Sequence, residues 1–180
     1  MKQTAKDVIG FWEQAGPAQW FQGGAAFDAQ CGERFLDLHM AAARGELVEW
    51  CGSAEGSLAL LLLLDQIPRN IFRGSAHAYA TDPMALAVAN QAIERGHDRE
   101  YELELRSFFY LPFMHSEDIA DQRRCVAIFQ GLPESGSAKW AVHHHEIIER
   151  FGRFPHRNHL LGRKSTPEEQ AWLNEGGFQG

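Results

Sequence analysis

The segment LALLLLLDQIPRNIFRG, residues 58–74, is the most informative stretch for the fold, because its first seven residues are all apolar. This run is far shorter than the ~20 residues that a membrane-spanning helix requires. We therefore expect a buried helix that begins after Ser53, a typical N-cap residue, and that ends before Pro68. The following PRNIF is then a turn or a short helix.

Helix signals continue on both sides of this run. Thr4 is expected to cap a first helix that ends near Gly16-Pro17, and Asp28 to open a second helix that ends at Gly45. The remaining signals predict helices from Thr81 to Arg95 with Gly96 as the stop, over about 98–110, from Glu117 to Gln130 with Ser116 as the cap, from Ser135 or Ser137 to Phe151, and from TPEE at 166–169 to Gly176.

Strand signals are almost absent, since β-branched residues are sparse and never alternate between hairpin turns. The sequence therefore predicts an all-α chain with about eight helices in antiparallel hairpins, as a bundle or a stack. At 180 residues, without a linker, it is expected to form a single domain over 1–180.

The three cysteines, Cys31, Cys51 and Cys125, lack a C-x-x-C pair. They are therefore expected to be buried thiols in a reducing compartment, not disulfides or zinc ligands. The first residues contain no continuous apolar region of the kind that a secretion signal needs, so we expect a cytoplasmic protein with no membrane partner.

One basic cluster stands out in a chain of formal charge −7. Residues 150–164, RFGRFPHRNHLLGRK, hold four arginines, a lysine and two histidines but no carboxylate. The rest of the chain is strongly acidic, which argues against nucleic-acid binding through phosphate neutralisation. A small anion or an acidic peptide end is the expected partner.

Polar residues also fall on apolar helix faces. His144 lies at the centre of such a face, and Asp118 and Gln122 share another at a spacing of four residues. Each has a structural interpretation: a core histidine with one hydrogen bond, a helix-cap carboxylate and a bond from Gln122 to the backbone. The alternative is that they face a ligand, because a buried polar group without a partner costs roughly 1–3 kcal/mol.

Asp65 ends the leucine-rich run, where no helix face is fully solvated. A buried carboxylate requires a cation, and Arg69, Arg73 or the arginines of 150–164 could supply it. An Asp–Arg network that fixes the loop corners and a ligand site are both open interpretations of this residue.

At these residues the sequence resembles a bacterial family of uncharacterised proteins with a tetratricopeptide-like helical fold. The resemblance covers nearly the whole chain and rests on FW at 11–12, LALLLLLDQIPRNIFRG at 58–74, FFYLPFMHSEDIADQ at 108–122 and HEIIERFGRFPHRNHLLGRKSTPEE at 145–169. Ile67 replaces a usual Phe, and Glu146 a usual Asp. The resemblance implies a fold of stacked helical hairpins, and an analogy of fold suggests peptide binding.

Three functions are compatible with these residues. The first is a binding protein for a small anion or a peptide carboxylate. The second is a structural or protein-interaction scaffold, and the third is an enzyme. The expected binding residues are Arg69, Asn70, Arg73, Gln122, Arg153, His156, Arg157, Asn158 and Arg163.

The enzyme hypothesis uses His144, Asp118, His115 and Asp65. These residues would act as a metal-assisted hydrolase, or without metal with His144 as a general base oriented by Asp118. The sequence contains no H-E-x-x-H, G-x-S-x-G, Walker or dinucleotide motif, so it identifies no cofactor.

Overall fold

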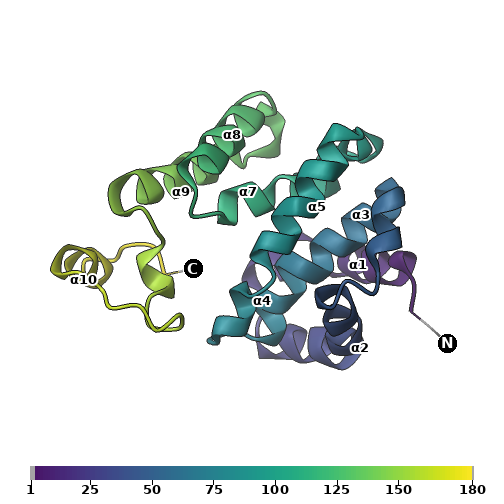
Figure 1. Ribbon diagram of the computed structural model, residues 1–180, viewed down its shortest axis with the longest axis horizontal. Helices are drawn as coiled ribbons and strands as arrows, with labels where there is room; N and C mark the ends of the chain where they lie inside the picture. The colour runs from purple at the N-terminus through teal and green to yellow at the C-terminus, as the bar shows by residue number, and fades with distance from the viewer. Residues whose placement is uncertain (1–2, 180) are drawn as a thin grey trace. The chain divides into compact units, whose positions relative to one another are not determined.

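The computed structural model describes residues 3–179, and over this range every regular element is a helix (Figure 1). The predicted all-α class is therefore confirmed, while the tetratricopeptide-like stack stays a prediction. The chain divides into two compact units. Unit 1 comprises the residues up to Arg73 together with His77–Pro112, and unit 2 comprises Gly74–Ala76 and the residues from Phe113 onward. The single domain over 1–180 also stays a prediction.

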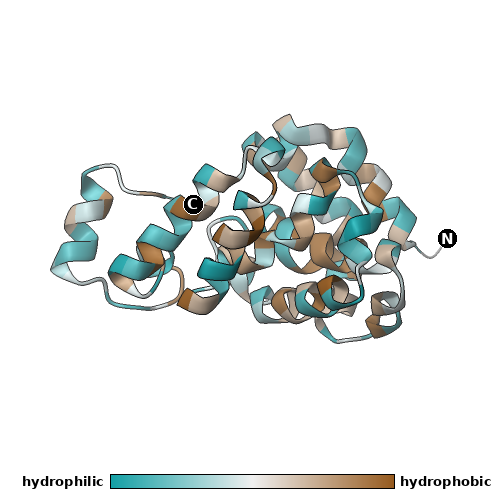
Figure 2. Cartoon of the chain, turned by 90° about the horizontal axis from the view of Figure 1, so that it is seen from above, coloured by the Kyte–Doolittle hydropathy of each residue, from teal (hydrophilic) through white to brown (hydrophobic). Residues whose placement is uncertain are grey.

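Unit 1 is built around the leucine-rich segment. Its helices include α1 (Ala5–Gln22), α2 (Ala25–Ala43), α3 (Ala54–Leu61), α4 (Ile67–Ile71) and α5 (Asp82–Glu94), with the π turn η2 (Leu62–Gln66) between α3 and α4. Helix α3 packs against α1 and α5, and α2 packs against α4. Leu58 and Leu61–Leu63 are completely buried, as expected, and Figure 2 shows hydrophobic residues gathered where these helices meet.

The first two helices differ from the predicted boundaries. Thr4 caps α1 in a capping box with Asp7, as expected. Gly16, at φ +71°, interrupts the helix without ending it, because Pro17 begins a further turn that runs to Gln22. Gly24, not Asp28, is the N-cap of α2, so the carboxylate of Asp28 remains available to another partner.

The prediction that the leucine-rich helix ends before Pro68 is wrong. In η2 the amide of Ile67 donates to the Leu62 carbonyl, five residues earlier, and the chain continues into α4. This widened turn accommodates the proline but leaves carbonyls without helical donors. The hydroxyl of Thr81 donates to Leu64 O at 2.5 Å, and Nδ1 of His39 to Leu63 O at 2.7 Å. Side chains from distant segments thus complete the backbone hydrogen bonding.

The single helix predicted over about 98–110 is also wrong. The segment forms η4 (His97–Glu100), α6 (Leu103–Arg106) and η5 (Ser107–Phe109), followed by α7 (Leu111–His115). Tyr101 is extended, with φ −115° and ψ 146°, so a helix cannot pass through it. The breaks allow both Phe108 and Phe109 to be buried.

Unit 2 contains α8 (Ile119–Gln130), α9 (Ala138–Phe151) and α10 (Pro167–Asn174), with the short η6 (Pro133–Ser135) and η7 (Pro155–Arg157). Helix α8 packs against α9. One core cluster of unit 2 consists of Ile147, Ile148 and Phe154, against which Ile119, Phe151, Trp172 and Phe178 pack. The predicted capping box between Thr166 and Glu169 is present.

Cys31, Cys51 and Cys125 are thiols and form no disulfide; Cys31 and Cys125 are buried and Cys51 is half-buried. Burial raises the pKa of Cys31 and of Cys125 to about 12, which keeps both thiols protonated. In the described part of the chain no helix combines the length and the apolarity that crossing a membrane requires.

Candidate functional site

The π turn of unit 1 holds the carboxylate of Asp65, which is 1% exposed. Its Oδ1 lies 3.3 Å from a terminal nitrogen of Arg69, and the amide of Gln66 donates to its Oδ2. The same guanidinium donates two hydrogen bonds to the carboxylate of Asp82, of 2.9 and 3.0 Å. Burial opposes the charge of Arg69, but Asp65 and Asp82 raise its pKa above the ordinary value. The Asp–Arg network is thus the arrangement found in this unit.

Asn70 and Arg73 extend this network to the surface. The amide of Asn70 donates to Gln66 O, and its Oδ1 accepts from Arg73. Arg73 binds both oxygens of Asp28 at 2.7 and 2.9 Å. An anion that used Arg73 would therefore have to displace an internal carboxylate.

The basic cluster of unit 2 faces carboxylates in the same way. Arg163 binds Glu117 through two bonds of 2.6 and 2.9 Å and also donates to Asn158 and to Phe154 O. The Phe154 amide donates to the same carboxylate at 2.8 Å. Burial raises the pKa of Glu117, but these bonds outweigh it, and the pKa lies below the ordinary value. Glu117 therefore ties the start of α8 to the loop before η7.

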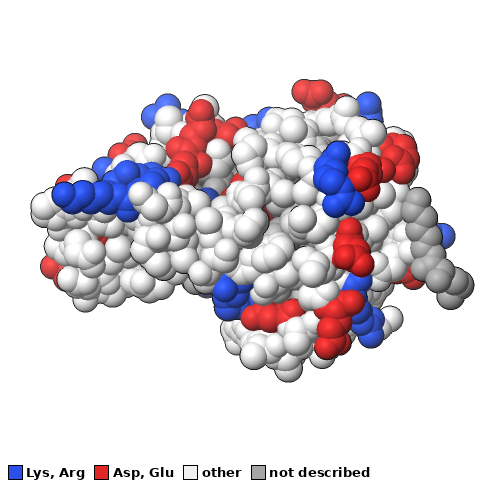
Figure 3. Space-filling view, turned by 60° about the horizontal axis from the view of Figure 1, so that its bottom comes forward, with Lys and Arg blue, Asp and Glu red and all other residues white. Residues whose placement is uncertain are grey.

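Glu169 is the second internal partner, and it is 2% exposed. It accepts two bonds from Arg153, of 2.6 and 2.8 Å, a further one from Asn158, and one from the backbone of Thr166. The bonds from Arg153 contribute most to lowering its pKa, to about 2. Arg150 pairs with Glu168 at the surface, and Figure 3 shows Lys or Arg side chains beside Asp or Glu on the face it displays.

Glu117 and Glu169 are not among the residues predicted from the sequence. A signal existed for Glu169, because a capping-box glutamate is a fixed carboxylate. For Glu117 the only signal was its place at a helix start, which does not specify an arginine 46 residues away.

Gln122 is completely buried on α8. Its Nε2 lies 3.3, 2.7 and 2.6 Å from the carbonyl oxygens of Phe113, Met114 and Ser116. The structural interpretation, a bond from the side chain to the backbone, therefore describes its amide nitrogen.

The prediction that Asp118 faces inward is wrong. Asp118 is exposed and is itself the N-cap of α8, with Oδ1 accepting from Ala120 N at 2.7 Å. Because α8 begins at Ile119, Asp118 is not part of the helix, and the helical periodicity does not determine where its side chain points. The cap interpretation is the one observed, and Ser116, the predicted cap, instead accepts from the Asp118 amide.

His144 is buried on the inner face of α9, as predicted. Its Nδ1 lies 2.8 Å from Trp140 O, and because a carbonyl only accepts, Nδ1 carries the proton and Nε2 is the basic nitrogen. Burial, reinforced by His115, lowers the pKa to about 4, so the ring is neutral at pH 7. A backbone carbonyl thus occupies the position at Nδ1 that an orienting carboxylate would take.

His156 and Arg157 are two adjacent basic side chains that are both buried in unit 2. They are 7% and 6% exposed, and the guanidinium carbon of Arg157 lies 4.5 Å from the centre of the Phe154 ring. Nδ1 of His156 is buried and has no hydrogen-bond partner. Burial, followed by the charge of Arg157, lowers the pKa of His156 to about 3.

The described residues contain no group of three or more His, Cys, Asp or Glu side chains arranged to hold a metal ion. His115 ends α7 in unit 2, close enough to affect His144 electrostatically, whereas Asp65 belongs to unit 1. The metal-assisted arrangement therefore gains no support from this geometry, and the catalytic roles stay predictions.

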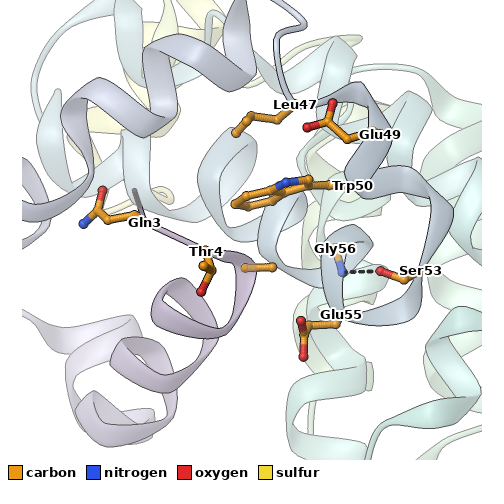
Figure 4. A pocket seen from close by; sticks show the side chains of 9 residues that line it. Gln3, Thr4, Leu47, Glu49, Trp50, Ser53, Glu55 and Gly56 are labelled. Atoms are coloured by element: carbon orange, nitrogen blue, oxygen red, sulfur yellow. Dashed lines mark hydrogen bonds between the residues drawn. The ribbon is translucent and has the colours of Figure 1, made fainter. Parts of the chain in front are cut away.

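Unit 1 also contains features that the sequence reasoning did not identify. Ser57 Oγ lies 3.0 Å from His97 Nδ1, and Tyr110 donates to Asp98 at 2.7 Å, all four side chains being buried. A hollow of about 400 Å³ lies around Trp50, next to the bond between Gly56 N and Ser53 Oγ (Figure 4). Two of its lining residues are acidic and none is basic, so it does not suit an anion.

Comparisons with known proteins place the chain among proteins without an assigned activity. A family model described as "Bacterial protein of unknown function (DUF924)" matches residues 8–177. The solved structure of a protein of unknown function from Agrobacterium tumefaciens is 55% identical, with a TM-score of 0.92, over 96% of this chain and 97% of that one. No curated protein matched the sequence.

Proposed function

The chain belongs to the bacterial family of unknown function DUF924, and from this premise we propose that unit 2 binds a small anionic molecule through His156 and Arg157. The observation that carries the proposal is the buried Nδ1 of His156, which has no hydrogen-bond partner. Leaving such an atom unpaired costs roughly 1–3 kcal/mol. In the tautomer that carries its proton on Nδ1, an oxygen of a bound anion would accept from this N–H and recover that cost.

The surroundings of His156 favour negative charge. Arg157 contributes a buried guanidinium whose carbon lies 4.5 Å from the centre of the Phe154 ring and whose charge acts on the imidazole of His156. A carboxylate or phosphate would accept from both side chains. Burial and then the charge of Arg157 lower the pKa of His156, and a bound anion would offset that charge.

This proposal is narrower than the set of binding residues expected from the sequence. Arg69, Arg73, Arg153 and Arg163 already bind Asp82, Asp28, Glu169 and Glu117 through paired bonds. Of these four, Arg153 and Arg163 belong to unit 2, where they fix the segments that carry the proposed site. The proposal retains His156, because its Nδ1 has no hydrogen-bond partner, and Arg157, because its charge acts on this imidazole; His144 also acts on His156 electrostatically.

Thermal unfolding in acetate, citrate, phosphate and sulfate, at constant ionic strength in chloride, tests the proposal. An anion at a hundred times its dissociation constant should add about 2.7 kcal/mol to the free energy of unfolding. The shift should disappear in His156→Phe, which keeps a ring but removes Nδ1. The same change at exposed His159, His159→Phe, should preserve it. A shift that persists in His156→Phe would refute the assignment.

A structural scaffold is the second candidate, and the internal ion pairs favour it. If the network only fixes packing, no anion of the panel will shift the unfolding of the wild-type protein. The enzyme hypothesis has no comparable observation in its favour.

A further inference from the structure

The ring of Phe178 lies where three imidazoles of unit 2 converge. Its centre is 4.8 Å from that of His144, 5.1 Å from His156 and 5.6 Å from His143. All three contacts are edge-to-face, a favourable arrangement for aromatic rings. Phe178 also packs on the core of Ile147, Ile148 and Phe154. A residue that follows the last helix thus covers the proposed anion site.

The backbone conformation of the segment after α10 places the ring of Phe178 at this position. Gly176 has φ +91°, a conformation that other residues rarely adopt. A Cβ on Gly177 would lie 2.5 Å from the Trp172 ring, so only glycine allows the chain to pass so closely. Gln179 then donates to Gly177 O at 2.7 Å and to Leu173 O at 3.2 Å. We call residues Gly176–Gln179 the tail.

The tail leaves the polar part of the site unfilled. Phe178 supplies an aromatic ring to His144 and His156, but the structure gives Nδ1 of His156 no hydrogen-bond partner. A ligand with an aromatic ring and an acidic group would make both kinds of contact.

We propose that the tail is a displaceable internal occupant of the site and that the ligand is an aromatic carboxylate. The ring of the ligand takes the place of Phe178 against His144 and His156, and its carboxylate accepts from His156 and Arg157. This inference rests on the proposed anion site, and it adds the substrate class and a device that limits access to it.

Displacement makes the tail a competitor of the ligand. Wild-type protein must release Phe178 before an aryl group enters, so its apparent affinity is reduced by the fraction of molecules in which the site is open. Removing the ring of Phe178 abolishes that competition. A small anion without a ring does not need the position of Phe178, and the tail affects its binding little.

Calorimetric titration of the full chain with 3-phenylpropionate, cyclohexylacetate, acetate and phosphate distinguishes these effects. Phe178→Ala should bind 3-phenylpropionate at least tenfold more tightly than the wild type, with at most a twofold change for acetate or phosphate. Phe21→Ala, which removes a ring that is 66% exposed in unit 1, should bind all four as the wild type does. If Phe178→Ala does not fold, Phe178→Leu replaces it, because leucine keeps apolar bulk without a ring. The same gain in affinity for 3-phenylpropionate is expected for this variant.

The outcomes separate the two proposals. Unchanged affinity for 3-phenylpropionate in the Phe178 variants, with phosphate or acetate still binding, overturns the tail as a competitor and leaves the anion site in place. Equal gains for cyclohexylacetate and 3-phenylpropionate overturn the aromatic class. Failure of every anion to bind both the wild type and the variants overturns the anion site itself.

Discussion

The two buried histidines of unit 2 make the stability of the protein depend on pH. An unfolded histidine titrates near 6.5, whereas burial lowers the pKa of His144 to about 4 and that of His156 to about 3. Below pH 6.5 the unfolded chain therefore takes up protons that the folded protein does not. The free energy of unfolding should be unaffected by these two groups above pH 6.5 and should fall by about 2 kcal/mol per histidine between pH 7 and pH 5. Urea unfolding across this range measures it.

A substitution assigns the effect to its source. His156→Phe should reduce the slope by about 1.2 kcal/mol per pH unit between pH 6 and pH 5, while the exposed His159→Phe should leave it unchanged. The pairs of Glu117 and Glu169 do not interfere, because their lowered pKa values affect stability only as the pH falls below about 4.5. An unaltered slope in His156→Phe would show that this imidazole is not buried in its neutral form.

Single residues also show which features of the candidate site could be predicted from the sequence. His144 was predictable, because a position on an apolar helix face depends only on local periodicity. Asp118 was not, because Ser116 and Asp118 are both good caps and a shift of the helix start changes the direction in which a side chain points. The partners of the arginines were unpredictable for a different reason, since Glu117 and Arg163 meet only through the tertiary fold.

At the scale of the element, the π turn η2 depends on a hydrogen bond from a distant segment. Thr81 is 5% exposed, and its hydroxyl satisfies the Leu64 carbonyl that Pro68 cannot reach. Thr81→Val keeps the shape but leaves that carbonyl unpaired, so the free energy of unfolding should fall by roughly 1–3 kcal/mol. Denaturant unfolding monitored by circular dichroism would measure the loss.

A double-mutant cycle with Pro68→Ala tests the reason for this loss. Alanine at position 68 restores a backbone N–H that can donate to Leu64, so Thr81→Val should cost less in that background. An equal cost in both backgrounds would show that the hydroxyl does not compensate for the proline. The helix was predicted to stop before Pro68 because the effect of a proline on helix geometry was judged from its sequence neighbours alone. The hydrogen bonds that let the helix continue come from Thr81 and His39, which lie 17 and 24 residues from the carbonyls they bind.

At the scale of the whole molecule, composition and periodicity were sufficient for the all-α class but not for the division into units. Each helix signal depends on a few neighbouring residues, while the units depend on which apolar faces meet. The broken segment between Gly96 and His115 illustrates this, because burial of Phe108 and Phe109 overrides a helical pattern. Aromatic residues outside helices, such as Phe178, carry no periodic signal at all.

The single domain expected from the sequence predicts that the two units unfold together. The chain passes between them three times, at Arg73–Gly74, Ala76–His77 and Pro112–Phe113, so unfolding one unit alone would strain three connections.

Glu117→Ala removes a carboxylate that binds Arg163 and the Phe154 amide within unit 2. Hydrogen exchange of the slowest amides should then report the same loss of free energy in α3 of unit 1 as in α9 of unit 2. Glu168→Ala, at a surface ion pair with Arg150, should change neither by more than about 0.5 kcal/mol. Full protection retained in α3 while α9 exchanges faster would mean that the units unfold separately, and it would replace the single domain with two.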